Sequence, residues 1–186
     1  MPDINLLRCK WCNLKNPLYV EYHDSEWGVP QYDDSKLFEL LLLEPFQAGL
    51  AWETVLKKRE NFRKAFDHFD PEKISRYTQE KIDSLLADPG IIRNRRKIEA
   101  AVRNAAVYLQ IVEQWGSFSR YIWHFTDGKV IRETDKTSSS LSDAVTEDLQ
   151  SRGMRFVGTT IIYSYLQAIG VIDSHDEDCF LHKREA

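Results

Sequence analysis

The sequence predicts an all-α protein, and three observations support this prediction. Helix-capping residues followed by apolar residues at helical spacing recur along the whole chain. Glycine and proline are concentrated at the ends of these segments, where they begin or end helices. Alternating strand patterns are nearly absent. We therefore expect about seven or eight helices with short connections, and no repeat or Gly/Ser linker divides them.

The first predicted helix follows the cap candidates Asp33, Asp34 and Ser35, because the apolar run at 37–41 has the spacing of one helical face. A second helix is predicted over 50–66. Its aromatic and aliphatic residues fall within helical reach of one another, which is typical of a face that packs against a core.

Two short helices and one long helix follow. Asp70 is a cap with Pro71 at the first helical position, and Thr78 can cap the next helix. The Asp-Pro-Gly sequence at 88–90 then breaks the chain. After it, the pattern predicts a helix over about 93–114.

Two more helices are predicted in the last third of the chain. Ser140 or Ser142 begins a helix that Gly153 ends, and Thr159 begins a helix that Gly170 ends.

The connection before these helices has a different pattern. Val130 and Ile131, which follow Asp127-Gly128, predict the one extended segment. The polar stretch 132–140 predicts a surface connection or a mobile loop.

Composition excludes several classes of protein. The chain has 186 residues, 42% of them hydrophobic and 29% charged, which argues against disorder and allows a buried core. Three cysteines make no disulfide framework and suit a reducing compartment. No basic stretch followed by an apolar core begins the sequence, and the most apolar segment, 156–172, contains Thr, Ser and Gln. We therefore expect a cytoplasmic protein that does not enter a membrane.

Four possible metal ligands lie near the two ends of the sequence. Cys9 and His23 are near the start, and His175 and Cys179 form an H-x3-C pair near the end. Two thiolates and two imidazoles would make a closed, structural zinc site that joins the two ends. Cys12 competes with Cys9, since Cys9-x-x-Cys12 also has zinc-ligand spacing. Such residues are also common in packing or at surfaces, so spacing leaves both interpretations open.

A glycine-containing turn at 88–92 leads into four basic residues, Arg93, Arg95, Arg96 and Lys97. Unpaired backbone N–H groups at the start of a helix suit a phosphate oxygen, and the basic side chains add positive charge there. A capped helix with a solvated basic face explains the same residues equally well.

Aromatic residues gather in the N-terminal part of the chain, and a carboxylate lies close behind them. Indole and phenol rings together with a buried carboxylate are the groups that a pocket for a flat, electron-poor nitrogen base needs. Glu44 is the most informative of them, because it ends an apolar run where burial would demand a partner. The aromatic candidates are Trp11, Tyr19, Tyr22, Trp27 and Trp52.

With these residues the sequence resembles the constitutive 3-methyladenine DNA glycosylases of type I, a family of the helix-hairpin-helix superfamily. The resemblance extends over nearly the whole chain. The matching segments are RCKW at 8–11, NPLY at 16–19, YHDSEWGVP at 22–30, LFELLLLE at 37–44, QAGLAWETVLKKRENF at 47–62, GIIRNRRKI at 90–98, RGMRFVGTTIIYSYLQAIG at 152–170 and DSHDEDC at 173–179. Pro45-Phe46 departs from the family pattern, which has small or polar residues there.

The resemblance implies a helix-hairpin-helix glycosylase fold with a zinc-clipped lobe. It divides the single unit 1–186 into a helical region of about 35–125 and a terminal lobe of 1–34 with 126–186. The implied cofactor is a structural zinc ion (Zn2+). Its implied ligands are Cys9, His23, His175 and Cys179, which favours Cys9 over Cys12.

The resemblance also implies roles in base and DNA binding. Glu44 and Tyr22 match the residues that bind the edge of the methylated base, and Trp52 matches the residue that stacks on it. The same pocket would be walled by Trp11, Tyr19 and Trp27. The implied DNA-contacting residues are Gly49 and Leu50 at the gap left by the flipped nucleotide, and Gly90, Ile91, Arg93, Arg95, Arg96 and Lys97 in the hairpin.

The implied function is base-excision repair by a monomer. The enzyme would hydrolyse the N-glycosidic bond of 3-methyladenine in alkylated duplex DNA, release the free base and leave an abasic site. No isolated lysine stands at the usual nucleophile position after the hairpin, which predicts a monofunctional glycosylase. The alternatives are a non-enzymatic helix-hairpin-helix DNA-binding module and a hydrolase of free nucleosides.

The charge of the chain initially argues against a nucleic-acid partner, since the net charge is −4. Its distribution changes this view. Residues 57–103 hold 13 Lys and Arg against 8 Asp and Glu, a local net charge of +5. The sequence therefore allows a local basic footprint on an acidic protein.

Overall fold

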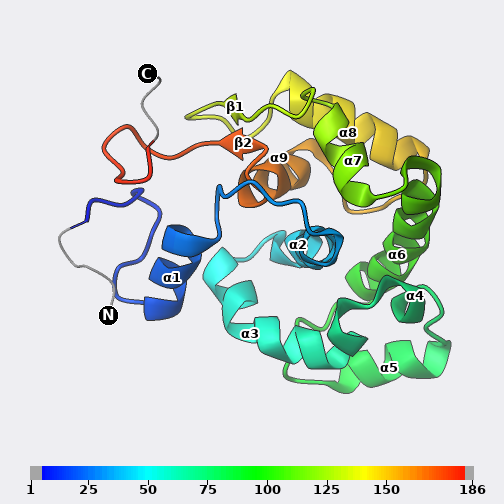
Figure 1. Cartoon of the computed structure of the whole chain (residues 1–186). Coiled ribbons are helices and arrows are strands. Elements are labelled where there is room, and N and C mark those ends of the chain that lie inside the picture. Colours follow the sequence, from blue (N-terminus) through cyan, green and yellow to red (C-terminus); the bar gives the residue numbers. More distant parts are fainter. Residues whose placement is uncertain (1–5, 183–186) are drawn as a thin grey trace.

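The computed structural model describes residues 6–182 and is almost entirely helical (Figure 1). Within these residues it has nine α-helices, one 3-10 turn and two short strands. The helices are α1 Pro17–Ser25, α2 Asp34–Gln47, α3 Trp52–Ala65, α4 Pro71–Ile74, α5 Gln79–Ala87, α6 Arg95–Trp115, α7 Phe118–His124, α8 Ser140–Ser151 and α9 Thr159–Ala168. The 3-10 turn is Asp67–Phe69, and the strands are β1 Ile131–Arg132 and β2 Ile172–Asp173. The prediction of an all-α fold is confirmed.

Most helix starts lie where the capping residues predict them. The Asp33 side chain accepts hydrogen bonds from the first turn of α2, and Asp70 and Thr78 do the same for α4 and α5. Asn94 caps α6, which begins two residues after the predicted start at Arg93. The predicted extended segment is β1, which pairs in parallel with β2.

Two helices were not predicted, α1 and α7. The sequence nevertheless carries their caps, because Asn16 precedes Pro17 at the first position of α1 and Ser117 caps α7. Both helices have only two turns, so their apolar periodicity is weak.

Helix α2 lies at the centre of the molecule (Figure 1). All of its residues from 37 to 46 are buried, and it contacts α3, α6, α7 and α9. Pro45 lies inside this helix, and Phe46 packs in the core against Phe62, with ring centroids 4.8 Å apart. The departure from the family pattern at 45–46 is thus accommodated in the core, one residue after Glu44.

The two ends of the described chain lie side by side. The Phe180 N–H donates to the Leu7 carbonyl at 2.8 Å, and the Lys10 N–H donates to the Asp176 carboxylate at 2.8 Å. Within residues 6–182, no helix has the length and hydrophobicity that a membrane span requires. Because α2 packs against helices of both predicted regions, the division into 35–125 and 1–34 with 126–186 stays a prediction.

Candidate active site

A cavity of about 270 Å³ lies between α1, α2, α3, α9 and the segments near the two ends of the chain. The structure brings all six predicted pocket residues to its walls. Its aromatic lining is Trp11, Tyr19, Tyr22, Trp27 and Trp52, and its polar lining is Glu44, Gln47, Asp135, Ser164, Gln167, Ser174 and Asp176. The cavity thus has aromatic walls and a polar, partly acidic lining, which suits a flat ligand with a polar edge.

The aromatic residues also support one another. The Trp11 ring lies 5.2 Å from Tyr19 and 4.8 Å from Trp27 between ring centroids, and Tyr22 lies 5.6 Å from Trp52. Tyr19 and Tyr22 are nearly parallel at 6.4 Å, one turn apart on α1. These contacts fix the orientation of the rings before a ligand enters.

Glu44 is a buried carboxylate, only 4% exposed, near the C-terminal end of α2. Among residues 6–182, neither its Oε2 atom nor the Nε1 atom of Trp52 at the start of α3 has a hydrogen-bond partner. Burial raises the pKa of Glu44 from 4.5 to about 8. A buried polar atom without a hydrogen-bond partner destabilises the folded protein. Because Glu44 lines the cavity, a ligand can supply the missing partner.

Tyr22 is the second buried polar group of the pocket. Burial raises the pKa of its hydroxyl well above the ordinary value, and the nearby Glu44 charge raises this pKa further. The hydroxyl therefore keeps its proton, and it can donate a hydrogen bond to a ligand edge.

The sequence did not predict the polar lining opposite these residues. Ser164 and Gln167 come from α9, and Ser174 and Asp176 follow β2. The only sequence signal was the presence of Ser and Gln within the otherwise apolar segment 156–172. Asp135 comes from the polar stretch 132–140, which is therefore more than a surface connection.

A second cavity of about 200 Å³ joins the predicted DNA-facing loop to the pocket. Glu44, Gln47 and Ser164 line both cavities, and Gly49 and Leu50 line only the second one. Leu50 is 43% exposed, which is unusual for a large apolar side chain next to a buried helix. The loop thus presents an apolar side chain beside the entrance to the pocket.

The side chain of Lys97 is buried, although its position within a group of basic residues predicts that it is exposed. It is only 7% exposed, and its Nζ atom donates to the carbonyls of Phe46 at 3.1 Å and Ala48 at 2.8 Å. Burial lowers the pKa of this amine. The interpretation of Lys97 as a phosphate contact is therefore corrected: it holds the C-terminal end of α2, from which the loop with Gly49 and Leu50 starts.

Hydrogen bonds hold the turn between α5 and α6. Lys58 on α3 donates to the carbonyls of Pro89 and Gly90 at 3.0 and 3.2 Å. The Gly90 N–H donates to the Asp88 carboxylate at 2.7 Å, so it is not free for a phosphate. A Cβ atom at Gly90 would lie 2.9 Å from that carboxylate, which explains the glycine. The Ile91 side chain is 3% exposed, so it packs inward.

The three arginines of the hairpin differ in their surroundings. Arg93 and Arg96 are exposed, and the Arg96 guanidinium lies 5.8 Å from the Phe156 ring. Arg95 is engaged by Asp83 at 2.7 Å and Glu99 at 3.6 Å. The positive side chains best placed for a polyanion are therefore Arg93 and Arg96.

Three of the four predicted metal ligands meet at the ends of the chain. The Cys9 Sγ, Cys179 Sγ and a ring nitrogen of His23 lie within 4.8 Å of one another, and all three residues are buried. Cys12 is not in this group, and its Sγ lies 3.9 Å from the Tyr19 carbonyl. Among the described residues, this geometry selects Cys9 over Cys12.

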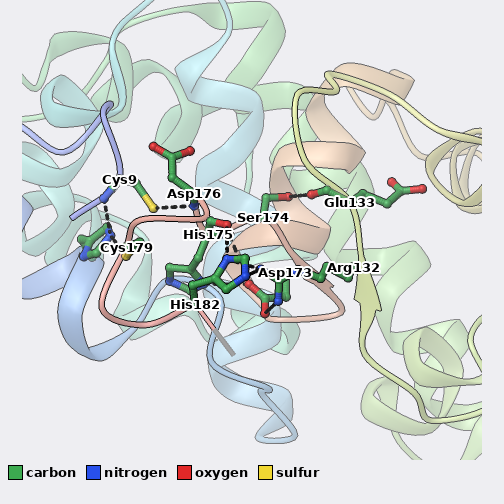
Figure 2. Close-up of polar contacts among 10 residues, drawn as sticks. Cys9, Arg132, Glu133, Asp173, Ser174, His175, Asp176, Cys179 and His182 are labelled. Carbon is green, nitrogen blue, oxygen red and sulfur yellow. Dashed lines mark hydrogen bonds and ion pairs between the residues drawn. The ribbon is translucent and has the colours of Figure 1, made fainter. Parts of the chain in front are cut away.

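His175 lies beside this cluster, near Cys9 and Cys179 (Figure 2). Its ring centroid is 5.6 Å from that of His23, and its buried Nε2 atom has no hydrogen-bond partner in the part of the chain that the structure describes. Its Nδ1 atom lies 2.8 Å from Asp173, and the Nδ1 atom of His23 lies 2.9 Å from Asp24. A carboxylate on the far nitrogen is the usual arrangement around a metal-binding histidine.

The surroundings of His175 hold it in place. Asp173 is bound in turn by Arg132 at 3.3 Å (Figure 2). A Cβ atom at Gly28 would lie 2.5 Å from the His175 ring, so the backbone at Gly28 closes over it. The donor set of two thiols and two imidazoles, with one imidazole nitrogen unpaired, fits a zinc ion.

Known proteins resemble this chain in sequence and in fold. The family profile described as methyladenine glycosylase matches residues 11–182. DNA-3-methyladenine glycosylase 1 of Escherichia coli (strain K12) is 46% identical over 179 residues, which cover 92% of this chain and 95% of that protein.

Solved structures are similar over the same range. The crystal structure of a 3-methyladenine DNA glycosylase I (TAG) has a TM-score of 0.90 and 47% identity, and the match covers 95% of this chain and all of that one. A structure on 3-methyladenine recognition by the enzyme from Staphylococcus aureus has a TM-score of 0.88 and 38% identity, covering 92% and 95%. The chain therefore belongs to the methyladenine glycosylase family.

Proposed function

We propose that this protein is a monofunctional DNA glycosylase that removes 3-methyladenine from alkylated DNA. It hydrolyses the N-glycosidic bond, releases the free base and leaves an abasic site. The observation that carries the proposal is the buried carboxyl of Glu44, whose Oε2 atom has no hydrogen-bond partner among the described residues, inside a pocket with aromatic walls. Membership of the methyladenine glycosylase family supports it.

The pocket selects the damaged base by charge. Methylation at N3 makes adenine cationic, and a carboxylate that faces the cation gains electrostatic energy that neutral adenine cannot supply. A hydrogen bond to a charged group contributes about 1.5–3 kcal/mol. We assign Glu44 to this role, Tyr22 to hydrogen bonding at the base edge and Trp52 to stacking, while Trp11, Tyr19 and Trp27 wall the pocket.

The chemistry requires little from the protein, because the positive charge already weakens the glycosidic bond. A water molecule attacks the sugar carbon as the bond to the base breaks. The electron pair of that bond stays with the base, which leaves as a neutral molecule, and the attacking water releases one proton to solvent. No lysine lines the cavity within residues 6–182, and Lys97 donates to two carbonyls, so we assign no Schiff-base step.

Duplex DNA would approach the hairpin and the loop that opens beside the pocket. We propose that the α5–turn–α6 unit is a helix-hairpin-helix motif whose exposed Arg93 and Arg96 contact phosphates. Gly49 and Leu50 would enter the gap that the flipped nucleotide leaves, because Leu50 is exposed and its loop shares a cavity with the pocket.

A structural zinc ion fits the cluster at the chain ends. Cys9, His23, His175 and Cys179 would hold it, and four protein ligands leave no open position for catalysis. Bound zinc would join the N-terminal segment with Trp11 to the C-terminal segment with Asp176, both of which line the pocket. The proposed terminal lobe, 1–34 with 126–186, thus supports one side of the active site.

The test is release of bases from methylated duplex DNA. Purified protein is incubated with the duplex, and released bases are separated and identified by mass spectrometry. The proposal predicts 3-methyladenine in the soluble fraction and alkali-sensitive abasic sites in the DNA. Binding without release would favour a DNA-binding module, and hydrolysis of free nucleosides alone would favour a nucleoside hydrolase. We also propose that the protein acts as a monomer, as the family resemblance implies.

A further inference from the structure

A cluster of ion pairs lies behind the base pocket and joins the three helices that carry the proposed base contacts. Tyr22 is on α1, Glu44 on α2 and Trp52 on α3. Arg59, also on α3, contacts a glutamate at the end of α1 and another inside α2. Tyr22 lines the base pocket on one side and a separate cavity on the other, and Arg59 lines only the latter.

The geometry of Arg59 is well defined. Its Nη1 and Nη2 atoms each lie 2.7 Å from one oxygen of Glu26, which is a bidentate pair. Its Nε atom lies 2.6 Å from Glu39, a residue that is only 5% exposed. Arg63 binds the same Glu39 oxygen at 2.8 Å. Burial alone would lower the pKa of Arg59, but the hydrogen bonds that it donates to both glutamates raise the pKa above its ordinary range.

Each glutamate that Arg59 binds lies on, or at the end of, a helix that carries a base-contacting residue. The Glu26 N–H donates to the Tyr22 carbonyl at 3.0 Å and so ends α1 directly below Tyr22. Glu39 precedes Glu44 on α2, and Arg59 follows Trp52 by two turns of α3, on the same face of that helix.

We propose that Arg59 is a positioning residue that sets the distances between Tyr22, Glu44 and Trp52 by holding α1 and α2 against α3. The proposal rests on the proposed function. A planar guanidinium fork with three fixed donors is suited to this task, because each bond constrains direction as well as distance. A misplacement of about 1 Å in an active site can reduce the rate on the order of 100-fold.

The alternative is that Arg59 only neutralises the buried Glu39. Two variants separate these roles. Arg59→Met removes the fork and leaves Glu39 with Arg63 alone. Adding Glu39→Gln removes the buried charge as well, so that most of the lost stability returns while the helices stay unclamped.

Arg152→Met is the matched control. Arg152 bridges Asp148 on α8 at 2.6 Å and Gln114 on α6 at 2.7 Å, and it does not line the pocket. Single-turnover release of 3-methyladenine from methylated duplex is measured for all variants at a temperature where urea titration shows each one folded. Binding of the free base is followed by tryptophan fluorescence, and binding of undamaged duplex by anisotropy.

The proposal predicts at least a tenfold loss of kcat/KM and of free-base affinity for Arg59→Met, with undamaged-duplex affinity within about twofold of wild type. Arg59→Met/Glu39→Gln regains stability but not excision, and Arg152→Met excises like wild type. If Arg59→Met excises at the wild-type rate, or if the double variant regains both stability and excision, the positioning role is wrong. If Arg59→Met does not fold, the excision rate of Arg59→Met/Glu39→Gln decides between the two roles in the same way. Failure of the wild-type protein to release any base would instead overturn the proposed function.

Discussion

Replacing Glu44 with glutamine should stabilise the folded protein at alkaline pH. Glu44 is 4% exposed, its Oε2 atom has no hydrogen-bond partner within residues 6–182, and burial raises its pKa from 4.5 to about 8. Below pH 4.5 the carboxyl is protonated in both the folded and the unfolded state, so it contributes no pH dependence. Between pH 4.5 and 8 the unfolded chain releases the proton while the folded protein keeps it. The free energy of unfolding therefore falls as the pH rises through this window.

The size of the effect follows from the two pKa values. Each pH unit between them contributes about 1.4 kcal/mol, so the ionised carboxyl destabilises the folded protein by at most about 5 kcal/mol above pH 8. Glu44→Gln keeps the size of the side chain but cannot ionise. Its free energy of unfolding should equal that of wild type below pH 4.5 and exceed it increasingly up to pH 8.

The assay is urea unfolding of both proteins at intervals from pH 5 to 9. Glu53→Gln serves as a control whose stability difference from wild type should stay constant over this range. The pKa of Glu53 is lowered from 4.5 by hydrogen bonds from Asn16 and Asn13, so its stabilising contribution is fully present from pH 5 to 9 and is lost only at lower pH. A stability difference between Glu44→Gln and wild type that does not change from pH 5 to 9 would refute the reasoning about Glu44.

Three further predictions concern the metal, the loop and the hairpin. Elemental analysis should find one zinc ion per chain. His175→Ala should lose the zinc ion and melt at a lower temperature, whereas Cys12→Ser should keep it. Zinc retained by His175→Ala at an unchanged melting temperature would contradict the proposed site. Lys97→Met should lower the free energy of unfolding by about 1–3 kcal/mol, because two backbone carbonyls at the end of α2 lose their donor. It should also weaken binding to abasic duplex in an anisotropy titration, and wild-type binding would show that the loop does not depend on this lysine. Arg93→Ala should reduce by about 1 the slope of the logarithm of the duplex-binding constant against the logarithm of the salt concentration. Arg120→Ala on α7 should leave this slope unchanged. Equal slopes for the two variants would show that Arg93 does not contact DNA phosphates.

Much of the fold could be predicted from local signals. Asp33, Asp70 and Thr78 cap helices as expected, because a side-chain oxygen before an apolar periodic segment satisfies the first backbone N–H groups. Helices α1 and α7 escaped prediction, since a two-turn helix has too few apolar residues to show a period. Their stability comes from tertiary packing rather than from local propensity.

The candidate site was predictable only in part. Glu44 could be found from sequence because a carboxylate after an apolar run is conspicuous. Ser164 and Gln167 could not, because the pocket gains them only when α9 packs against α2, more than 100 residues along the chain. Lys97 was misplaced for a related reason. A lysine within a group of arginines is expected to be exposed to solvent, and only the packing of α6 against the end of α2 buries its amine.

The central claim is that the Glu44 carboxylate recognises the positive charge of the damaged base. The most direct test is the single-turnover rate of 3-methyladenine release from one methylated duplex, measured for wild type and Glu44→Gln across pH 6 to 9. A charged hydrogen bond of about 1.5–3 kcal/mol predicts that the variant is on the order of 10- to 100-fold slower. At protein concentrations well below saturation this rate reports kcat/KM. The wild-type value should rise towards pH 8 as Glu44 of the free enzyme loses its proton, and that of the variant should not. Equal rates for the two proteins, with the same pH profile, would contradict the claim.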